Sequence, residues 1–276
     1  MSEAKNLLPL LLEPDSLQQA LSSKQADNIL LVDLGSEARF SQAHIPNARL
    51  IQPSETQAGP PIPGLSPSDA QLTQLFQRIG FTEDSHVVVY DDEGGGWAGR
   101  FIWLLDEIGH SKYSYLNGGI HAWADAGLPL ETGLISQPKS KIVVKNYAKN
   151  TVTADDLIKA LKANSLQIWD ARSPKEYNGE TINAAKGGHI PSAFNYEWTQ
   201  AMDHSQNLRL KPLKQILKEL QALGMSADKD TVTHCQSHHR SGLTYLLAKL
   251  LNFKSIKAYA GSWGEWGNHP DTPIES

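Results

Sequence analysis

Residues 231–242 have the sequence TVTHCQSHHRSG and include Cys235, the only cysteine of the chain. A run rich in β-branched residues leads into this cysteine, polar residues follow it, and the apolar segment Leu243–Leu251 comes next. This order predicts a buried strand, a tight loop and a largely buried helix. In such a loop, backbone N–H groups and the positive end of the helix face one point, where they would stabilise a thiolate.

Several side chains close to Cys235 carry positive charge or can donate a proton, namely His234, His238, His239 and Arg240. Cationic neighbours lower the pKa of a thiol, so this pattern indicates a cysteine nucleophile. One alternative is an inert packing cysteine, since free cysteines are often buried. Another is a metal site with Cys235, His238 and His239 as ligands. Adjacent ligands would strain around one zinc ion, and no second Cys/His cluster follows, so we expect no metal.

Length, charge and cysteine content restrict the class of protein. A chain of 276 residues is long enough for two domains of ordinary size. The net charge is −5, and the sequence contains no long run of residues with one sign of charge. This balance disfavours nucleic acid as a partner. A single cysteine suits a reducing compartment. The apolar run Leu7–Leu12 is short and lacks a basic start, so we expect a cytoplasmic protein without a membrane span.

The same order of elements occurs twice along the chain. In the first half, residues 13–21 predict a helix and Ile29–Asp33 a buried strand. In the second half, residues 153–161 predict a helix and Leu166–Asp170 a buried strand. Strands that alternate with helices in this way predict an α/β fold, with a mostly parallel sheet flanked by helices in each half.

Short motifs support a tandem duplication. The sequence His-Ile-Pro occurs at residues 44–46 and again at residues 189–191. The segment Arg78–Phe81 is matched by Ala222–Met225, which places Gly224 144 residues after Gly80. The repeated motifs and the repeated element order predict two related domains.

The domain boundaries follow from residues that interrupt regular structure. We predict a first domain at residues 1–135, a linker at residues 136–150 and a second domain at residues 151–276. Residues 59–67 are rich in proline and glycine, and they predict a surface excursion within the first half.

The two halves differ at the position where chemistry is expected. At the repeat offset Asp91 aligns with Cys235, and Asp92, Glu93 and the glycines of residues 94–96 follow it. No side chain there can attack sulfur. Three glycines are compatible with a phosphate-binding loop, but the three carboxylates would repel an anion. We therefore expect an inactive loop in the first domain and the activity in the second.

Four segments carry a resemblance to a known family: Asp170–Tyr177, Gly188–Pro191, Gly261–Trp266 and the loop that begins at Cys235. The loop sequence CQSHHRS differs only at Ser237 from the Cys-Gln-Thr-His-His-Arg-Ser loop of a bacterial rhodanese subtype. Over nearly its whole length the chain resembles the tandem-domain rhodaneses, which are thiosulfate sulfurtransferases and their 3-mercaptopyruvate-using relatives.

The resemblance implies a six-residue loop, Cys235 to Arg240, whose N–H groups hold a cysteine persulfide. It implies transfer of sulfur from thiosulfate to cyanide or a thiol by a ping-pong mechanism, without metal or organic cofactor. The expected substrate-binding residues are Gln236, Ser237, His238, His239, Arg240, Arg172 and Trp198. For Arg172 the alternative is a structural ion pair, and for Trp198 it is core packing.

The sequence leaves the substrate open. Residues 236 and 237 are neither basic, as in thiosulfate-using members, nor small, as in mercaptopyruvate-using members, and Glu176 stands where vertebrate-type enzymes often have a basic residue. A persulfide carrier that receives sulfur from a desulfurase would use the same cysteine, with sulfur-relay proteins as partners. A cysteine phosphatase would have five residues between cysteine and arginine, whereas this chain has four.

Overall fold

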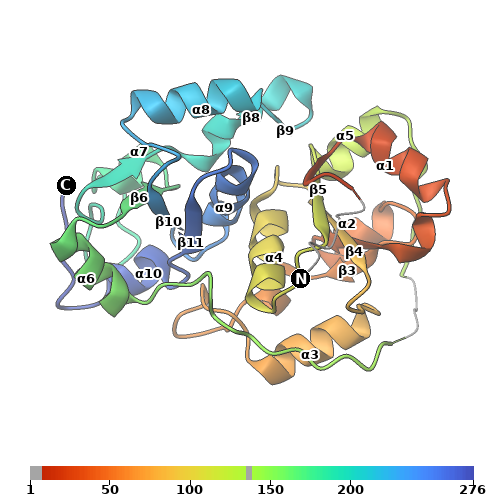
Figure 1. Ribbon diagram of the computed structural model, residues 1–276, viewed down its shortest axis with the longest axis horizontal. Coiled ribbons are helices and arrows are strands. Elements are labelled where there is room, and N and C mark those ends of the chain that lie inside the picture. Colours follow the sequence, from red (N-terminus) through yellow and green to blue (C-terminus); the bar gives the residue numbers. More distant parts are fainter. Residues whose placement is uncertain (1–7, 135–138) are drawn as a thin grey trace. The chain divides into compact units, whose positions relative to one another are not determined.

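The computed structural model describes residues 8–134 and 139–276, and the chain forms two compact units (Figure 1). The first unit comprises Met1–Thr56, Pro67–Ala148 and Asp203–Leu210, and the second comprises Gln57–Ser66, Lys149–Met202 and Lys211–Ser276. Each unit therefore includes a short segment from the other half of the sequence. The boundary predicted between residues 135 and 136 lies outside the described residues.

The first unit is built on a five-stranded sheet in which all neighbouring strands are parallel. In spatial order its strands are β1 (Leu11–Leu12), β5 (Tyr113–Leu116), β4 (His86–Asp91), β2 (Ile29–Leu34) and β3 (Arg49–Ile51). Strand β2 coincides with the predicted strand and pairs with β4 along its whole length. Both strands are almost entirely buried, as expected for the centre of a parallel sheet.

Helices flank this sheet (Figure 1). The helices are α1 (Pro14–Leu21), α2 (Glu37–Gln42), α3 (Asp69–Arg78), α4 (Gly96–Glu107) and α5 (Gly119–Asp125), with 3₁₀ turns at Ala26–Asn28 and Pro53–Thr56. Helix α1 begins where the sequence predicts it, because Pro14 at the first helical position already has helical backbone angles. Helix α3 begins with a capping box between Ser68 and Gln71.

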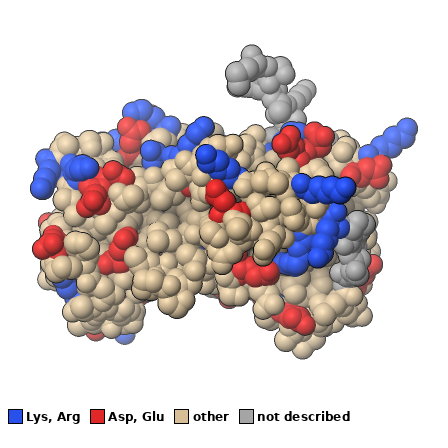
Figure 2. Space-filling view, turned by 90° about the horizontal axis from the view of Figure 1, so that it is seen from below, with Lys and Arg blue, Asp and Glu red and all other residues tan. Residues whose placement is uncertain are grey.

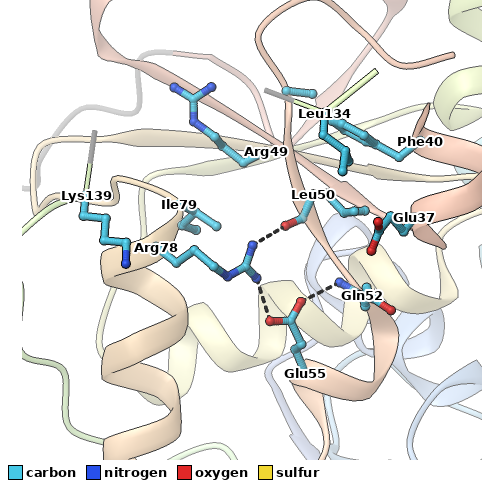
Figure 3. A pocket seen from close by; sticks show the side chains of 11 residues that line it. Glu37, Phe40, Arg49, Leu50, Gln52, Glu55, Arg78, Ile79, Leu134 and Lys139 are labelled. Atoms are coloured by element: carbon cyan, nitrogen blue, oxygen red, sulfur yellow. Dashed lines mark hydrogen bonds and ion pairs between the residues drawn. The ribbon is translucent and has the colours of Figure 1, made fainter. Parts of the chain in front are cut away.

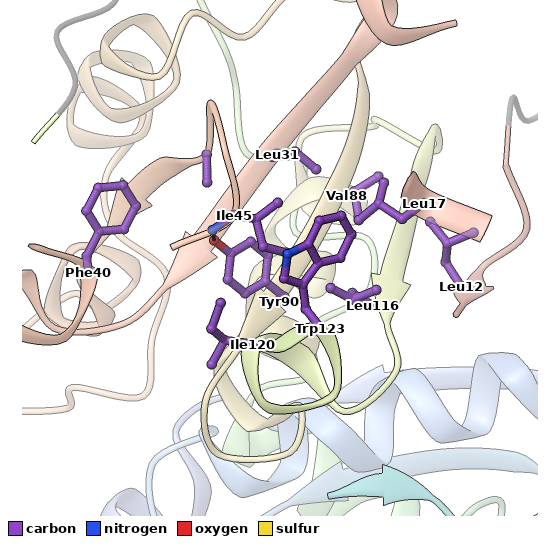
Figure 4. Packing of buried hydrophobic residues seen from close by; sticks show 11 residues of the cluster. Leu12, Leu17, Leu31, Phe40, Ile45, Val88, Tyr90, Leu116, Ile120 and Trp123 are labelled. Carbon is purple, nitrogen blue, oxygen red and sulfur yellow. Dashed lines mark hydrogen bonds between the residues drawn. The ribbon is translucent and has the colours of Figure 1, made fainter. Parts of the chain in front are cut away.

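A cluster of buried hydrophobic residues joins α5 to the sheet (Figure 4). The Trp123 ring of α5 is fully buried in the same cluster as Val88 and Tyr90 of β4. The Trp123 indole N–H donates to the carbonyl of Pro129 at 2.8 Å, and the Tyr90 hydroxyl accepts from the N–H of Ile45 at 3.1 Å. The polar atoms of both rings are thus satisfied inside the core.

The second unit repeats this plan with four strands, again all parallel. Their spatial order is β11 (Ser255–Ala258), β10 (Asp230–His234), β6 (Gln167–Asp170) and β7 (Ala193–Asn195). Two shorter strands, β8 (Met202–Asp203) and β9 (Arg209–Leu210), lie outside both main sheets. The predicted fold class, two α/β domains with parallel sheets flanked by helices, is confirmed.

The helices of the second unit place the cysteine loop. They are α6 (Ala154–Ala163), α7 (Pro174–Tyr177), α8 (Leu213–Ala222), α9 (Arg240–Leu250) and α10 (Ser262–Trp266), with a 3₁₀ turn at Trp198–Ala201. A further 3₁₀ turn, His204–Gln206, lies in the segment that belongs to the first unit. Helix α6 begins behind Thr153, as predicted, with a capping box to Asp156. Helix α9 begins at Arg240, three residues before the predicted apolar start, so the last residue of the loop is also the first residue of the helix.

The duplication extends to individual side-chain contacts. His44 stacks on Phe40 with ring centroids 3.8 Å apart, and its Nδ1 lies 2.8 Å from the Phe40 carbonyl oxygen. His189 stacks on Tyr177 at 3.6 Å, and its Nδ1 lies 2.9 Å from the Tyr177 carbonyl oxygen. The repeated His-Ile-Pro motif thus marks the same packing device in both units.

The expectation of a surface excursion at residues 59–67 is confirmed for most of this segment, because only Gly64 and Pro67 are buried. Residues Gln57–Ser66 pack into the second unit. Gly64 is buried there, and a Cβ atom at this position would overlap the carbonyl oxygen of Ala260 and lie 3.1 Å from the carbonyl carbon of Ser237. The proline and glycine content gave no information about the surface that the segment contacts.

Replacement of Gly64 with valine is expected to destabilise the second unit by about 2 kcal/mol, because the added atoms overlap backbone that cannot move freely. Urea unfolding followed by fluorescence measures the effect. Ala58 lies exposed in the same segment, so Ala58→Val serves as the matched control and should leave stability nearly unchanged. Equal stability of the two variants would contradict the tight packing of Gly64.

The described part of the predicted linker, residues 139–150, contains no helix or strand. Hydrogen bonds attach this segment to α3. The Ser140 N–H donates to the Gln77 carbonyl at 3.0 Å, and the Gln77 side-chain amide donates to the Ile142 carbonyl at 2.8 Å.

In residues 8–134 and 139–276, no helix has the length and apolar character needed to cross a membrane. Figure 2 shows one face of the molecule, where basic and acidic side chains are interspersed.

Candidate active site

The cysteine loop connects the carboxyl end of β10 to α9, and α10 holds it from outside. The Ser262 hydroxyl accepts hydrogen bonds from the N–H groups of Cys235 at 3.4 Å and His238 at 3.1 Å. The N–H groups of Trp263 and Gly264 donate to loop carbonyls, each at 2.9 Å. Two N–H groups and two carbonyls of the loop are therefore bound by the start of α10.

The loop closes around the sulfur atom of Cys235, which is 1% exposed. The hydroxyl of Ser241 lies 3.4 Å from the sulfur, and the N–H groups of Ser237 and Ser241 also hydrogen-bond to it. Burial alone would raise the pKa of the Cys235 thiol, but the Arg240 charge and these hydrogen bonds outweigh it and lower the pKa. The site is therefore organised to hold a thiolate.

Arg240 is fixed by Glu176, which lies 64 residues earlier in the chain. The guanidinium donates to both carboxylate oxygens, at 2.6 and 2.9 Å. Glu176 is 6% exposed and also completes the capping box of α7 with Ser173. Burial alone would raise the pKa of Glu176, but the bonds from Arg240 and Ser173 lower it to about 2. In the sequence, Glu176 stands out only as a departure from vertebrate-type enzymes, and no local pattern links it to Arg240.

The Glu176–Arg240 pair is expected to stabilise the protein in a pH-dependent way. Because the pKa of Glu176 falls to about 2 on folding, its contribution is fully present above the ordinary glutamate pKa of about 4.3 and is lost as the pH falls towards about 2. Urea unfolding of wild type and Glu176→Gln between about pH 3 and about pH 7 measures the difference. A stability difference that does not shrink at the acidic end would contradict the pair.

A second buried charge cluster lies at the end of β6. The Asp170 carboxylate, fully buried, accepts from Nε of Arg172 at 3.0 Å and from its Nη2 at 2.6 Å, and lies 3.5 Å from Nε2 of His234. Burial opposes ionisation, but His234 and Arg172 together keep the pKa of Asp170 below its ordinary value. Burial also lowers the pKa of His234.

Arg172 and His234 are thereby removed from the surface. Arg172 is 1% exposed, donates to the Gly188 carbonyl at 2.9 Å and lies over the Trp263 ring at 4.2 Å. This placement fits the alternative interpretation of Arg172 as a structural ion-pair partner, and we do not propose it as a substrate ligand.

The remaining predicted site residues lie at the rim of the loop, with one exception. Gln236, Ser237, His239, Arg240 and Trp198 are all partly exposed. The Trp198 ring meets His239 edge to face at 5.3 Å, so it forms a wall beside the loop. His238 is the exception: its backbone is left-handed, with φ of 57°, and its buried ring faces Ser241.

The corresponding loop of the first unit is filled by its own side chain. Asp91 ends β4 and is fully buried. Its carboxylate accepts from the N–H groups of Glu93 at 3.1 Å, Gly95 at 2.8 Å and Ala98 at 3.0 Å. The N–H groups that would bind a phosphate are thus occupied by this carboxylate, which adds a physical reason against phosphate binding there.

A pocket of about 460 Å³ in the first unit lies beside β3 and α3 (Figure 3). Among the side chains that line it, Arg78 is paired with Glu55 at 2.7 Å and donates to the Leu50 carbonyl at 2.9 Å. The residues that line it include no Cys, Ser or Thr side chain. Within the described ranges, no three His, Cys, Asp or Glu side chains gather in an arrangement suited to a metal ion.

Comparison with known proteins identifies the family. Residues 13–126 and residues 153–269 each match the rhodanese-like domain. The chain therefore belongs to the rhodanese family, as its sequence motifs predict. It is 54% identical to the thiosulfate sulfurtransferase of Azotobacter vinelandii over 269 residues, which is 97% of each protein. It is 49% identical to the thiosulfate sulfurtransferase of Pseudomonas aeruginosa, with the same coverage.

A solved structure supports the same assignment. The chain resembles a 3-mercaptopyruvate sulfotransferase of Escherichia coli with a TM-score of 0.81 and 26% sequence identity, over 93% of this chain and 99% of that protein. Sulfur transfer thus fits the family, the fold and the cysteine loop together.

Proposed function

We propose that the protein is a thiosulfate sulfurtransferase that carries sulfur as a persulfide on Cys235. The observation that carries the proposal is the buried cysteine sulfur, on which the N–H groups of Ser237 and Ser241 converge beside the Arg240 charge. Such a site favours an anionic sulfur, and the close relatives in Azotobacter and Pseudomonas bear the name of this activity.

The reaction has two half-reactions. The Cys235 thiolate attacks the outer sulfur of thiosulfate, the sulfur–sulfur bond of thiosulfate breaks, and sulfite leaves with the bonding electron pair. Cyanide or a thiolate then attacks the terminal sulfur of the persulfide, and the electron pair of the broken bond returns to Cys235. Each half-reaction balances without a metal, an oxidant or an organic cofactor, and the covalent relay predicts ping-pong kinetics.

The rim residues are assigned to substrate binding. Arg240 and His239 attract the anionic donor. Gln236 and Ser237 border the opening of the site, and the Trp198 ring forms one side of it. The first domain, whose loop is filled by Asp91, takes no part in the chemistry. We place the reaction in the cytoplasm, where sulfur-relay proteins are available as acceptors besides small thiols.

3-Mercaptopyruvate is the alternative donor. It is favoured by the structural likeness to the Escherichia coli 3-mercaptopyruvate sulfotransferase, while Gln236 and Ser237 match the pattern of neither donor. A persulfide carrier is compatible with the same cysteine, and rapid sulfur uptake from a desulfurase with slow turnover of small thiols would distinguish it.

Intact-mass measurement tests the proposal. Wild-type protein incubated with thiosulfate should gain the mass of one sulfur atom, cyanide should remove it, and Cys235→Ala should gain nothing. The same measurement with 3-mercaptopyruvate compares the two donors. Absence of any sulfur gain with both small donors and with a desulfurase would reject sulfur transfer, and loss of aryl-phosphate hydrolysis in Cys235→Ser would favour a phosphatase.

A further inference from the structure

A chain of hydrogen bonds leads away from the cysteine sulfur into the second unit. The Ser241 hydroxyl lies 3.4 Å from the sulfur of Cys235. The same hydroxyl lies 2.8 Å from Nδ1 of His238. Cys235 is 1% exposed, and His238 and Ser241 are each 0% exposed, so water does not replace these contacts. The chain bypasses the rim residues assigned to substrate binding.

The chemistry of a thiolate fixes the direction of these hydrogen bonds. A thiolate can only accept, so the Ser241 hydroxyl must donate its single proton to the sulfur. The hydroxyl oxygen then has only lone pairs to offer His238, and Nδ1 of His238 must carry a hydrogen. The left-handed backbone of His238, with φ of 57°, turns the ring inward to make this contact.

The charges around Ser241 and His238 argue against a positively charged His238 ring that carries hydrogen on both nitrogens. The positively charged Arg240 ends the loop, and His234, the last residue of β10, lies just before the loop. From other elements, Arg172 and Asp170 at the end of β6 neutralise each other, and Glu176 of α7 pairs with Arg240. The start of α9 adds a positive dipole end. A neutral ring with hydrogen on Nδ1 is therefore the form that suits the site.

We propose that Ser241 is a catalytic hydrogen-bond donor to the sulfur of Cys235, and that His238 is a positioning residue that holds the Ser241 hydroxyl in its donating orientation. This role deepens the proposed function and rests on it. When the acceptor takes the terminal sulfur, the bond to Cys235 breaks and its electron pair returns to the cysteine sulfur. The Ser241 hydroxyl stabilises the thiolate that leaves in this step, so it accelerates release of sulfur from the persulfide. It also stabilises the Cys235 thiolate of the resting enzyme.

The intact chain offers a clean readout, because Cys235 is its only cysteine. Alkylation by iodoacetamide across a range of pH gives the pKa of the Cys235 thiol without any sulfur donor, so this test is independent of the proposed sulfur transfer. The variants are Ser241→Ala, His238→Ala, the double variant and His238→Asn. Asparagine accepts a left-handed backbone and places an amide N–H near the position of Nδ1, so it retains the donor. His189→Gln is the matched control, because His189 contacts Tyr177.

The expected midpoint of alkylation rises by about one pH unit in Ser241→Ala and in His238→Ala, which is about a tenfold loss of thiolate below the midpoint. The double variant should shift no further, because the two residues act as one unit. His238→Asn and His189→Gln should keep the wild-type midpoint. Release of sulfur from the persulfide to cyanide should slow about tenfold in Ser241→Ala.

Several results would overturn the assignment. If the alkylation midpoint of Ser241→Ala equals that of wild type, Ser241 is not a donor to the sulfur. This comparison remains valid even if His238→Ala fails to fold. Additive shifts in the double variant, or a shift in His238→Asn equal to that in His238→Ala, would mean that His238 acts only by packing. If the alkylation shifts appear but no persulfide forms from any donor, the hydrogen-bond chain stands and the proposed sulfur transfer fails.

Discussion

Replacement of Arg240 with alanine is expected to slow persulfide formation by about 100-fold, the loss typical when one stabilising donor is removed from a buried anionic site. Two effects combine. The thiolate loses the charge that contributes most to lowering the pKa of Cys235, and the Glu176 carboxylate, only 6% exposed, is left without its partner at the loop. Single-turnover mass measurement with thiosulfate gives the rate.

Two further variants separate these effects. Arg240→Lys keeps the charge but cannot bond both carboxylate oxygens, so it should recover part of the rate. The double variant Arg240→Ala/Glu176→Gln removes the unpaired carboxylate and should be faster than Arg240→Ala alone. If the double variant is no faster, the penalty does not come from Glu176, and the pair has no role in setting the reactivity of Cys235.

Replacement of Asp170 with asparagine is expected to lower the free energy of unfolding by about 3 kcal/mol, because it leaves a buried cation without its counter-charge. Arg172 is 1% exposed and makes its closest ion pair, at 2.6 Å, with this carboxylate. Asparagine has nearly the same shape, so the effect reports charge rather than packing.

Urea unfolding near neutral pH measures this loss. Asp155→Asn is the matched control, since Asp155 is an exposed acidic residue in the first turn of α6, and its replacement should change stability by less than about 1 kcal/mol. Similar losses in both variants would show that the buried cluster does not depend on the Asp170 charge.

Much of the fold is visible in the sequence because local signals and tertiary structure agree. Pro14 and Thr153 start helices where their side chains suit the first turn. The β-branched run before Cys235 becomes β10, and the apolar run after it becomes α9. The repeated His-Ile-Pro motif predicts the duplication, which the structure confirms in both sheets.

The site was predictable in outline and not in its contacts. The position of Cys235 between strand and helix follows from local patterning. The Glu176–Arg240 pair joins residues 64 positions apart, and no periodic pattern links them. His238 looks like its neighbour His239 in the sequence, yet the left-handed turn at φ of 57° sends one ring inward while the other stays at the rim. Such a turn is set by the closure of the whole loop.

The exchange of short segments between the two units has a consequence for how this protein can be divided. A cut in the linker would leave the C-terminal fragment without Gln57–Ser66, and the N-terminal fragment without Asp203–Leu210. Each fragment would then expose the backbone that its missing segment covers, such as the carbonyl of Ala260 beneath Gly64. The two halves of the sequence are therefore not self-contained modules, and we expect a protein split in the linker to need both pieces to regain its native form.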